Sequence, residues 1–319
     1  MQKTVLIPQD IHEEGKLYLR ERGYEIKMGN GTAPDALKKD VEGCIAILIR
    51  TALLPAEVLE AGRDLKVVAR HGVGVDNIDI EAATRLGIWV TNAPESNSNS
   101  VAEHVIGLII ACARNYIRCD REFRGGNFEI RNQLIGMDLE GKTLGIVGLG
   151  RVGSLVAKKA SLGLDMKVVG YDPYIAADKV APGVQKMGDW DQVFKTCDFV
   201  TLHLPANSET KGIVGKREFS LMKSSAYLIN AARGEIVNEA ELVEALKAGQ
   251  IAGAGLDVFE KEPPERDSAL LALDNVMLSP HNAALTEEAM IRMATHAAQG
   301  IDEVMSGKRP SWPVNDLTK

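Results

Sequence analysis

Short hydrophobic runs alternate with amphipathic segments along almost the whole chain. The amphipathic segments, such as residues 11–22, 55–61 and 80–86, have the spacing of helices with one apolar face. Strands that alternate with helices predict a parallel sheet covered on both faces, so the expected fold class is α/β. Strands are predicted at residues 4–7, 44–49, 66–69, 88–91, 143–148, 167–171, 199–204, 226–231, 253–258 and 276–279.

The alternation breaks in the middle of the chain. The segment NAPESNSNS at residues 92–100 is rich in loop-forming residues. One long helix is predicted over residues 101–118, with Ser100 as its N-cap and Glu103 completing a capping box. Residues 121–141 are polar and irregular, and we interpret them as an excursion from the globule that could form a subunit contact. A last helix is predicted over residues 286–305.

Length and composition narrow the class of protein. A chain of 319 residues favours roughly two domains. The net charge of −7 disfavours nucleic-acid binding, although it allows a local basic pocket. The longest apolar run, VIGLIIACA at residues 105–113, is far shorter than the ~20 residues of a membrane span. The four cysteines form no C-x-x-C pair and no leader pattern precedes them. We therefore expect a cytoplasmic protein with reduced thiols, no metal site and no membrane partner.

The strongest motif is KTLGIVGLGRVG at residues 142–153, where a predicted strand leads directly into a predicted helix. In this context Gly148 allows a tight turn, Gly150 lets the backbone approach a pyrophosphate, and Gly153 lets helix and strand pack closely. The N–H groups near Arg151 and Val152 then face the phosphates. The motif predicts a dinucleotide site.

An acidic residue follows at the expected distance. Asp172 ends the next predicted strand, where a carboxylate meets the ribose hydroxyls of the cofactor's adenosine. A carboxylate there repels a 2′-phosphate, so the sequence favours NAD over NADP.

Three further residues lie at the carboxyl ends of predicted strands, where open α/β sheets bind ligands: Arg233, Glu262 and His281. Taken singly, each has a plainer explanation as a surface ion pair, a solvated carboxylate or a structural histidine. Together they suit reduction of a keto acid. Histidine can donate the proton, the carboxylate can raise the pKa of the histidine, and arginine can orient the substrate carboxylate.

With these motifs the sequence resembles the D-isomer-specific 2-hydroxyacid dehydrogenase family over essentially its whole length. The resemblance rests on Gly148–Gly153 with Asp172, on HLP at residues 203–205, NAARGEIV at 230–237, GLDVFEKEP at 255–263 and SPH at 279–281. It implies Arg233 on the substrate, Glu262 paired with the histidine, and His281 as the acid/base group. Asp257 near the nicotinamide carboxamide, and cofactor contacts by His203, Pro205 and Ala231, are implied in the same way.

The resemblance also implies an architecture. The expected fold is two Rossmann-like, doubly wound parallel-sheet domains with the active site in the cleft between them. Residues 1–99 and 286–319 would form a discontinuous substrate-binding domain, and residues 100–285 the NAD-binding domain. The family implies a homodimer.

Substrate specificity is expected from the first domain. The segment HGVGVDNID at residues 71–79 could offer backbone N–H groups at Val73 and Gly74 to a carboxylate, or it could be a plain turn capped by Asp76 or Asn77. Arg50 matches a position near the substrate phosphate in phosphoglycerate dehydrogenases, and it could equally form a salt bridge. His71, where that subfamily has a small residue, and the absence of a glycine-rich stretch after His281 depart from its pattern. The chain given ends at Lys319, so we expect no C-terminal regulatory domain.

We therefore predict an NAD-dependent D-2-hydroxyacid dehydrogenase, with 3-phosphoglycerate as the favoured substrate. Reduction of hydroxypyruvate or glyoxylate is the alternative, followed by another anionic 2-hydroxy acid. Two rival functions use the same fold: a non-enzymatic NAD(H)-sensing interaction protein, and a formate or phosphite dehydrogenase.

Overall fold

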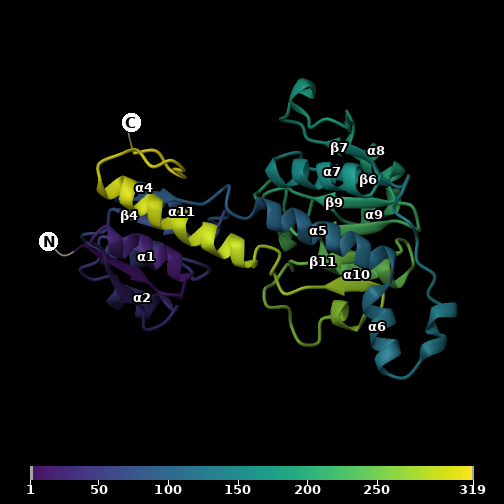
Figure 1. Ribbon diagram of the computed structural model, residues 1–319, viewed down its shortest axis with the longest axis horizontal. Helices are drawn as coiled ribbons and strands as arrows, with labels where there is room; N and C mark the ends of the chain where they lie inside the picture. Colours follow the sequence, from purple (N-terminus) through teal and green to yellow (C-terminus); the bar gives the residue numbers. More distant parts are fainter. Residues whose placement is uncertain (1–2, 318–319) are drawn as a thin grey trace. The chain divides into compact units, whose positions relative to one another are not determined.

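The computed structural model describes residues 3–317. The chain divides into two compact units. Unit 1 consists of Met1–Asn97 and Ala284–Lys319, and unit 2 is the continuous segment Ser98–Ala283. Each unit contains one parallel sheet with helices against it (Figure 1). The predicted α/β class with two doubly wound parallel sheets is confirmed.

Unit 1 contains a five-stranded sheet in the order β2-β1-β3-β4-β5. Its strands are β1 (Thr4–Ile7), β2 (Glu25–Met28), β3 (Ala46–Ile49), β4 (Val67–Arg70) and β5 (Trp89–Thr91). Its helices are α1 (Glu13–Glu21), α2 (Pro34–Asp40), α3 (Ala56–Ala61), α4 (Ile80–Arg85) and α11 (Glu287–Met305).

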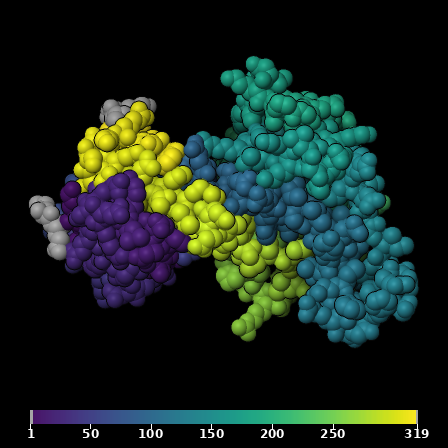
Figure 2. Space-filling model, in the orientation of Figure 1, coloured from purple at the N-terminus to yellow at the C-terminus, as the bar shows by residue number. Residues whose placement is uncertain are grey.

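The two ends of the chain build unit 1 together. Helix α11 packs on α1 so closely that a Cβ added at Gly15 would lie 2.7 Å from the Cβ of Ala294. In Figure 2 the yellow C-terminal segment accordingly lies beside the purple N-terminal segment. Alanines on α11, including Ala297 and Ala298, are fully buried in the same core as Val5 of β1. Small side chains thus let the last helix cover the first strands.

Unit 2 contains a seven-stranded sheet in the order β12-β11-β10-β9-β6-β7-β8. Its strands are β6 (Thr143–Val147), β7 (Lys167–Tyr171), β8 (Val184–Lys186), β9 (Phe199–Leu202), β10 (Tyr227–Asn230), β11 (Gly253–Leu256) and β12 (Val276–Leu278). Its α-helices are α5 (Ser98–Ala113), α6 (Tyr116–Arg124), α7 (Arg151–Gly163), α8 (Trp190–Thr196), α9 (Lys216–Leu221) and α10 (Glu239–Lys247). Four short 3-10 turns complete it: η1 (Phe128–Asn132), η2 (Ala177–Lys179), η3 (Gly234–Ile236) and η4 (Ala269–Ala272).

The register of unit 2 brings six strand ends to one edge of the sheet. Val147 pairs with both Tyr171 and Leu202, and Leu202 in turn pairs with Asn230. The row continues from Asn230 to Leu256 and from there to Leu278. The residues that follow these six therefore all emerge at the carboxyl edge. The strand order reverses between β6 and β9, which is where open α/β sheets bind ligands.

The helix predicted over residues 101–118 is wrong in its bounds. Helix α5 starts earlier, at Ser98, so Ser100 is a buried helical residue and not an N-cap. The helix also ends earlier, because Asn115 adopts a left-handed conformation with φ of 52°. Asparagine tolerates this conformation better than most residues. Helix α6 follows and its last turn runs into residues 121–141, which were expected to be irregular; Figure 1 shows it extending away from the sheet of unit 2.

Two strands were not predicted, β2 and β8. Both lie at the edge of their sheet, and their side chains are half-buried or exposed. Over residues 3–317, no helix is long and apolar enough to cross a membrane.

Candidate active site

The glycine-rich turn after β6 has the geometry of a dinucleotide loop. Gly148 has φ of 94°, and a Cβ added there would lie 2.5 Å from the carbonyl oxygen of His203. A Cβ at Gly153 would overlap the carbonyl oxygen of Gly148. Gly150, the N-cap of α7, is different, because a Cβ there would meet open space.

Asp172 follows the neighbouring strand β7 and bonds to the glycine-rich turn. Its carboxylate accepts a hydrogen bond from the backbone N–H of Leu149 at 2.9 Å and another from that of Tyr174, also at 2.9 Å. The acid predicted for the ribose hydroxyls therefore lies beside the glycine turn.

The other residues predicted to contact the cofactor lie along the same edge. Arg151 and Val152 open α7, with Arg151 exposed and Val152 half-buried. His203 follows β9, where its ring Nε2 lies 3.1 Å from Thr201 Oγ1. Burial lowers the pKa of His203 to about 4, so its ring is neutral at neutral pH. Pro205 is exposed and Ala231 is half-buried.

His281 and Glu262 form the closest acid–base pair of the site. His281 Nδ1 lies 2.6 Å from Glu262 Oε2, and Glu262 Oε1 accepts a hydrogen bond from the backbone N–H of Phe259. Burial raises the pKa of Glu262, but the hydrogen bond and charge of His281 outweigh this and hold the pKa below its ordinary value. An ionised carboxylate only accepts hydrogen bonds, so Nδ1 carries the proton and Nε2 is left for a substrate.

Arg233 lies on the adjacent loop. It follows β10, is half-buried, and its positive charge also lowers the pKa of Glu262. The buried Asn230 shapes this loop, since its side chain donates to the Arg233 carbonyl at 2.9 Å and accepts from the Ala232 N–H at 3.0 Å. A Cβ at Gly234 would overlap the backbone of Phe259. The loops that carry Arg233 and Glu262 are thus packed directly on each other.

Asp257 is fully buried at the end of β11. Its carboxylate accepts hydrogen bonds from the hydroxyl of Ser279 at 2.6 Å and from the N–H groups of Asn282 at 3.0 Å and Ala283 at 2.9 Å. The residue expected near the nicotinamide is therefore bonded to the turn that carries His281.

In unit 1, basic residues gather at the carboxyl ends of β3 and β4. Arg50 follows β3 and donates a hydrogen bond to the carbonyl of Asp10 at 2.9 Å. Arg70 ends β4 in register with Ile49, and its guanidinium donates to the carbonyl of His71. Burial lowers the pKa of His71 to about 3, and the charges of both arginines add to this effect. These positive charges form the local basic site that the overall acidic charge allows.

The loop after β4 presents backbone donors. Gly72 has φ of 133°, and Asn92 donates to the carbonyl of Val73 at 2.8 Å. Within residues 3–317, the N–H groups of Val73 and Gly74 have no protein acceptor. Asn77 does not cap this turn. Its amide donates to the carbonyls of Arg50 and Ala52 and so ties the Arg50 loop to this one.

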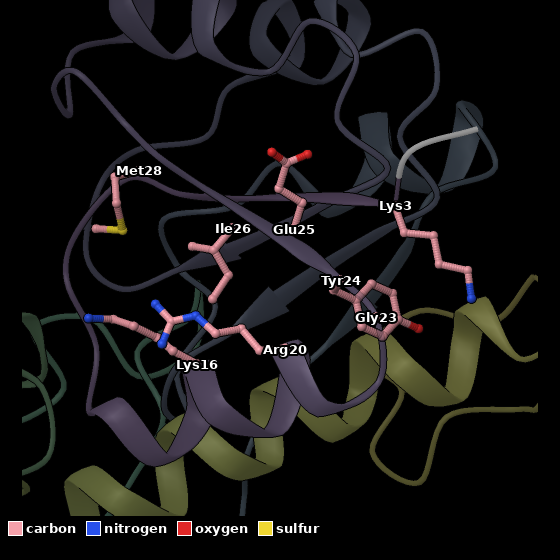
Figure 3. Close-up of a pocket in the computed structure, with 8 residues that line it drawn as sticks. All are labelled: Lys3, Lys16, Arg20, Gly23, Tyr24, Glu25, Ile26 and Met28. Atoms are coloured by element: carbon pink, nitrogen blue, oxygen red, sulfur yellow. The ribbon is translucent and has the colours of Figure 1, made fainter.

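A separate open groove of about 970 Å³ lies on unit 1 beside α1 and β2 (Figure 3). It contains none of the predicted site residues. Two of its cations already have acidic partners, because Lys16 pairs with Asp10 and Arg20 pairs with Glu13. We assign no part of the chemistry to this groove.

Sequence reasoning gave no role to Asn230, Ser279 or His104. His104 Nε2, on α5, lies 3.0 Å from Ser279 Oγ although 175 positions separate them. Asn230 and Ser279 stand inside the recognised motifs, so the motifs themselves were a signal for them. His104 gave none, because only the fold brings α5 to the end of β12.

Comparison with known proteins gives the family. The sequence profile of the family described as "D-isomer specific 2-hydroxyacid dehydrogenase, NAD binding domain" matches residues 106–283. This chain belongs to that family, and unit 2 contains its NAD-binding domain.

Individual relatives agree with this assignment. The D-3-phosphoglycerate dehydrogenase of Archaeoglobus fulgidus is 44% identical over 304 residues, which cover 95% of this chain but only 57% of that protein. The glyoxylate reductase of Korarchaeum cryptofilum is 37% identical over 325 residues, covering 99% of this chain and 96% of that protein. The crystal structure of the TT0316 protein from Thermus thermophilus superposes with a TM-score of 0.91 at 34% identity, covering 98% of this chain and 100% of that one.

Proposed function

We propose that this protein is an NAD-dependent D-2-hydroxyacid dehydrogenase. The observation that carries the proposal is the His281–Glu262 pair, 2.6 Å apart, on the unit that contains the NAD-binding domain. A proton donor paired with a carboxylate is what reduction of a carbonyl needs besides the cofactor.

His281 and Glu262 divide the proton chemistry between them. The nicotinamide cofactor, when bound, supplies or takes up the hydride at C2 of the substrate. His281 Nε2 accepts the proton of the substrate hydroxyl in oxidation and returns it to the carbonyl oxygen in reduction. Glu262 accepts from Nδ1, so it sets the ring orientation and stabilises the imidazolium that forms.

Arg233 is the group we assign to the substrate carboxylate and the C2 oxygen. A guanidinium presents a planar fork of donors, which suits a carboxylate. It also stabilises charge that develops on the carbonyl oxygen.

The cofactor would be held by the glycine turn. We assign the open space beside Gly150 to the pyrophosphate, and the Asp172 carboxylate beside the glycine turn to the adenosine ribose. The carboxylate of Asp172 supports NAD as the preferred cofactor.

The favoured substrate is 3-phosphoglycerate, whose phosphate suits the basic site at Arg50, with Val73 and Gly74 offering N–H groups to the carboxylate. The name of the Archaeoglobus relative supports this choice. Glyoxylate or hydroxypyruvate reduction is the second candidate, because the Korarchaeum glyoxylate reductase matches almost over its full length. In that case Arg50 serves to hold the loop through its bond to Asp10.

Substitutions of the acid–base pair test the reaction class. We expect His281→Ala to lower kcat/KM at least ~100-fold and Glu262→Gln to lower it ~10-fold or more. Glu265→Gln is the matched control, because Glu265 lies on the same loop but pairs with Lys261 instead of His281. Near-normal turnover by His281→Ala would remove this residue from the mechanism and would contradict the proposal.

We also propose a homodimer formed through residues 121–141. Apolar side chains on this segment are exposed, among them Phe123, Phe128 and Ile135, the last of these to 83%. Such a patch on a protruding segment favours a protein contact. Light scattering of Phe123→Asp should give a monomer where the unmodified chain gives a dimer. A monomeric unmodified chain would contradict this proposal.

A cytoplasmic location completes the proposal. It is supported by the thiols of Cys44, Cys112 and Cys197, which are free and buried. Burial raises the pKa of Cys112 to about 12 and that of Cys197 to about 11, so neither forms a reactive thiolate at neutral pH. Cell fractionation tests the location, and recovery of the protein outside the cytoplasmic fraction would contradict it.

A further inference from the structure

We propose that His104 is a positioning residue for the reaction, and that it acts through Ser279 and Asp257 on the turn that carries His281. This inference rests on the proposed function of His281. It concerns a helix, α5, that no motif connects with the chemistry.

The turn at His281 is held by one residue. His281 is a non-glycine residue with φ of 49°, which an L side chain rarely adopts. The N–H of His281 donates to the Asp257 carbonyl at 2.8 Å, and the next two N–H groups donate to the Asp257 carboxylate. Three successive N–H groups thus converge on Asp257, in the manner of a backbone nest around an anion.

Asp257 also lies close to the partner of His281. The N–H of Phe259, two residues further along, donates to Glu262 Oε1 at 3.1 Å. Both members of the His281–Glu262 pair are therefore attached to the same short stretch of backbone. A shift of Asp257 would change the distance between them.

The direction of the hydrogen bonds around Ser279 follows from proton counting. Ser279 Oγ donates to Asp257 Oδ1 at 2.6 Å, and this bond uses the single hydroxyl proton. The oxygen of Ser279 then accepts at 3.0 Å from His104 Nε2, which must carry a proton. His104 Nε2 itself lies 3.4 Å from Asp257 Oδ1, so its dipole also faces the buried charge.

Helix α5 is a firm base for this donor. It packs on β11 so closely that a Cβ at Gly255 would lie 3.2 Å from the Cβ of Leu108 and 3.2 Å from the sulfur of Cys112. His104 is one helical turn before Leu108, on the same face, and its side chain is 24% exposed. Without the imidazole, the Ser279 oxygen loses its donor, and only the bond to Asp257 still holds the hydroxyl.

The test compares two substitutions of His104. His104→Leu keeps the volume but removes the donor, whereas His104→Gln keeps an N–H near the position of Nε2. We expect His104→Leu to lower kcat about tenfold or more, because a small misalignment of a reacting group slows the reaction. His104→Gln should keep most of the kcat of the unmodified protein. The dissociation constant for NADH, measured by fluorescence, should change less than about threefold in both. Glu103→Gln, an exposed neighbour on α5, is the control and should match the unmodified protein.

A double variant tests whether the two residues act in one chain. Ser279→Ala should lower kcat as His104→Leu does, and the combined variant should be no slower than Ser279→Ala alone. Ser279→Ala is a small change and keeps the test available if His104→Leu does not fold. Additive losses, normal turnover of His104→Leu, or equal losses with Leu and Gln would each overturn the proposal.

An NMR readout separates this proposal from the proposed function. The Nδ1–H of His281, bonded to Glu262 at 2.6 Å, should give a downfield proton signal in the protein without cofactor. We expect the signal to move or broaden in His104→Leu and to be retained in His104→Gln. An unchanged signal would overturn the positioning role even if turnover fell. Normal turnover of His281→Ala would instead overturn the proposed function.

Discussion

The two units place different charged residues at the carboxyl edge of a parallel sheet. In unit 2 the carboxyl edge contains buried or half-buried acids, Asp172 and Asp257, whose oxygens accept backbone N–H groups. In unit 1 the same edge contains Arg50, Arg70 and a histidine whose pKa is lowered by burial and by both arginines. One sheet edge is thus suited to a cofactor and a proton donor, and the other to an anion.

The sheet architecture alone therefore does not determine which ligand a unit binds. Both sheets reverse strand order, between β1 and β3 in unit 1 and between β6 and β9 in unit 2. Only β6 is followed by the three-glycine turn. The chemistry is set by the few residues that follow each strand.

The largest expected effect is at Arg233, which we propose as the group that binds the substrate carboxylate. Arg233→Ala should lower kcat/KM at least ~100-fold, since it removes both the carboxylate contact and the stabilisation of the oxyanion. Arg233→Lys should recover little, because an ammonium lacks the planar fork. Steady-state kinetics measure both. A fall of less than tenfold for Arg233→Ala would mean that unit 2 provides the proton but not the carboxylate site.

The next effect belongs to unit 1. Arg50→Ala should lower kcat/KM for 3-phosphoglycerate by ~10- to 100-fold, because it removes a hydrogen bond to a charged group. The kcat/KM for glyoxylate should change less than about threefold. The ratio of the two substrates is the measurement. Equal losses for both would show that Arg50 is structural, as its bond to Asp10 allows.

Two glycines of unit 2 provide a smaller and more specific effect. Gly150→Ala should weaken NADH binding about tenfold with unchanged thermal stability, because its Cβ meets no protein atom. Gly153→Ala should instead destabilise unit 2 by about 1–3 kcal/mol, because its Cβ overlaps the Gly148 carbonyl. Calorimetry and NADH fluorescence separate the two. Loss of stability in Gly150→Ala would contradict the assignment of its free space to the cofactor.

The smallest effect concerns stability in acid. The folded-state pKa values of His71 and His203, about 3 and about 4, lie below the ordinary value of 6.5, so both rings stay neutral while the unfolded chain takes up protons. Stability should therefore fall as pH drops from about 6.5 toward these values, by up to about 1.4 kcal/mol per pH unit for each ring.

His71→Gln and His203→Gln should each flatten this pH dependence, as denaturant titrations at pH 7 and pH 5 would show. In unit 1 the effect is linked to charge, so Arg50→Ala should raise the pKa of His71 in an NMR titration. An unchanged pKa would show that Arg50 does not contribute to it.

The buried parts of the fold could be predicted from the sequence. Strands such as β3, β6 and β9 consist almost wholly of apolar residues, and no other element fits such short runs. The edge strands β2 and β8 were not predicted, because they are only four and three residues long and their side chains are half-buried or exposed. The break at Asn115 was also missed, because the long apolar run of α5 favoured one continuous helix and Asn115, with its left-handed conformation, follows soon after that run.

The site was predictable where chemistry is local in sequence. The glycine turn and Asp172 follow from one stretch of chain, and the structure brings Arg233, Glu262 and His281 to one edge of the sheet. What the sequence could not indicate is support between distant elements, such as His104 on Ser279. Such contacts depend on which helix face meets which strand, and that is settled only by packing.

The central claim is our proposal that this chain transfers a hydride between NAD(H) and C2 of a D-2-hydroxy or 2-keto acid, and one absorbance assay tests it most directly. NADH would be followed with 3-phosphoglycerate in the oxidative direction, and with hydroxypyruvate, glyoxylate and pyruvate in the reductive direction. We predict turnover, fastest with 3-phosphoglycerate. Preference for an unphosphorylated keto acid would agree with the proposed reaction class but contradict 3-phosphoglycerate as the proposed substrate. No turnover with any of the four, while NADH still binds, would contradict the account and favour a protein that senses the cofactor.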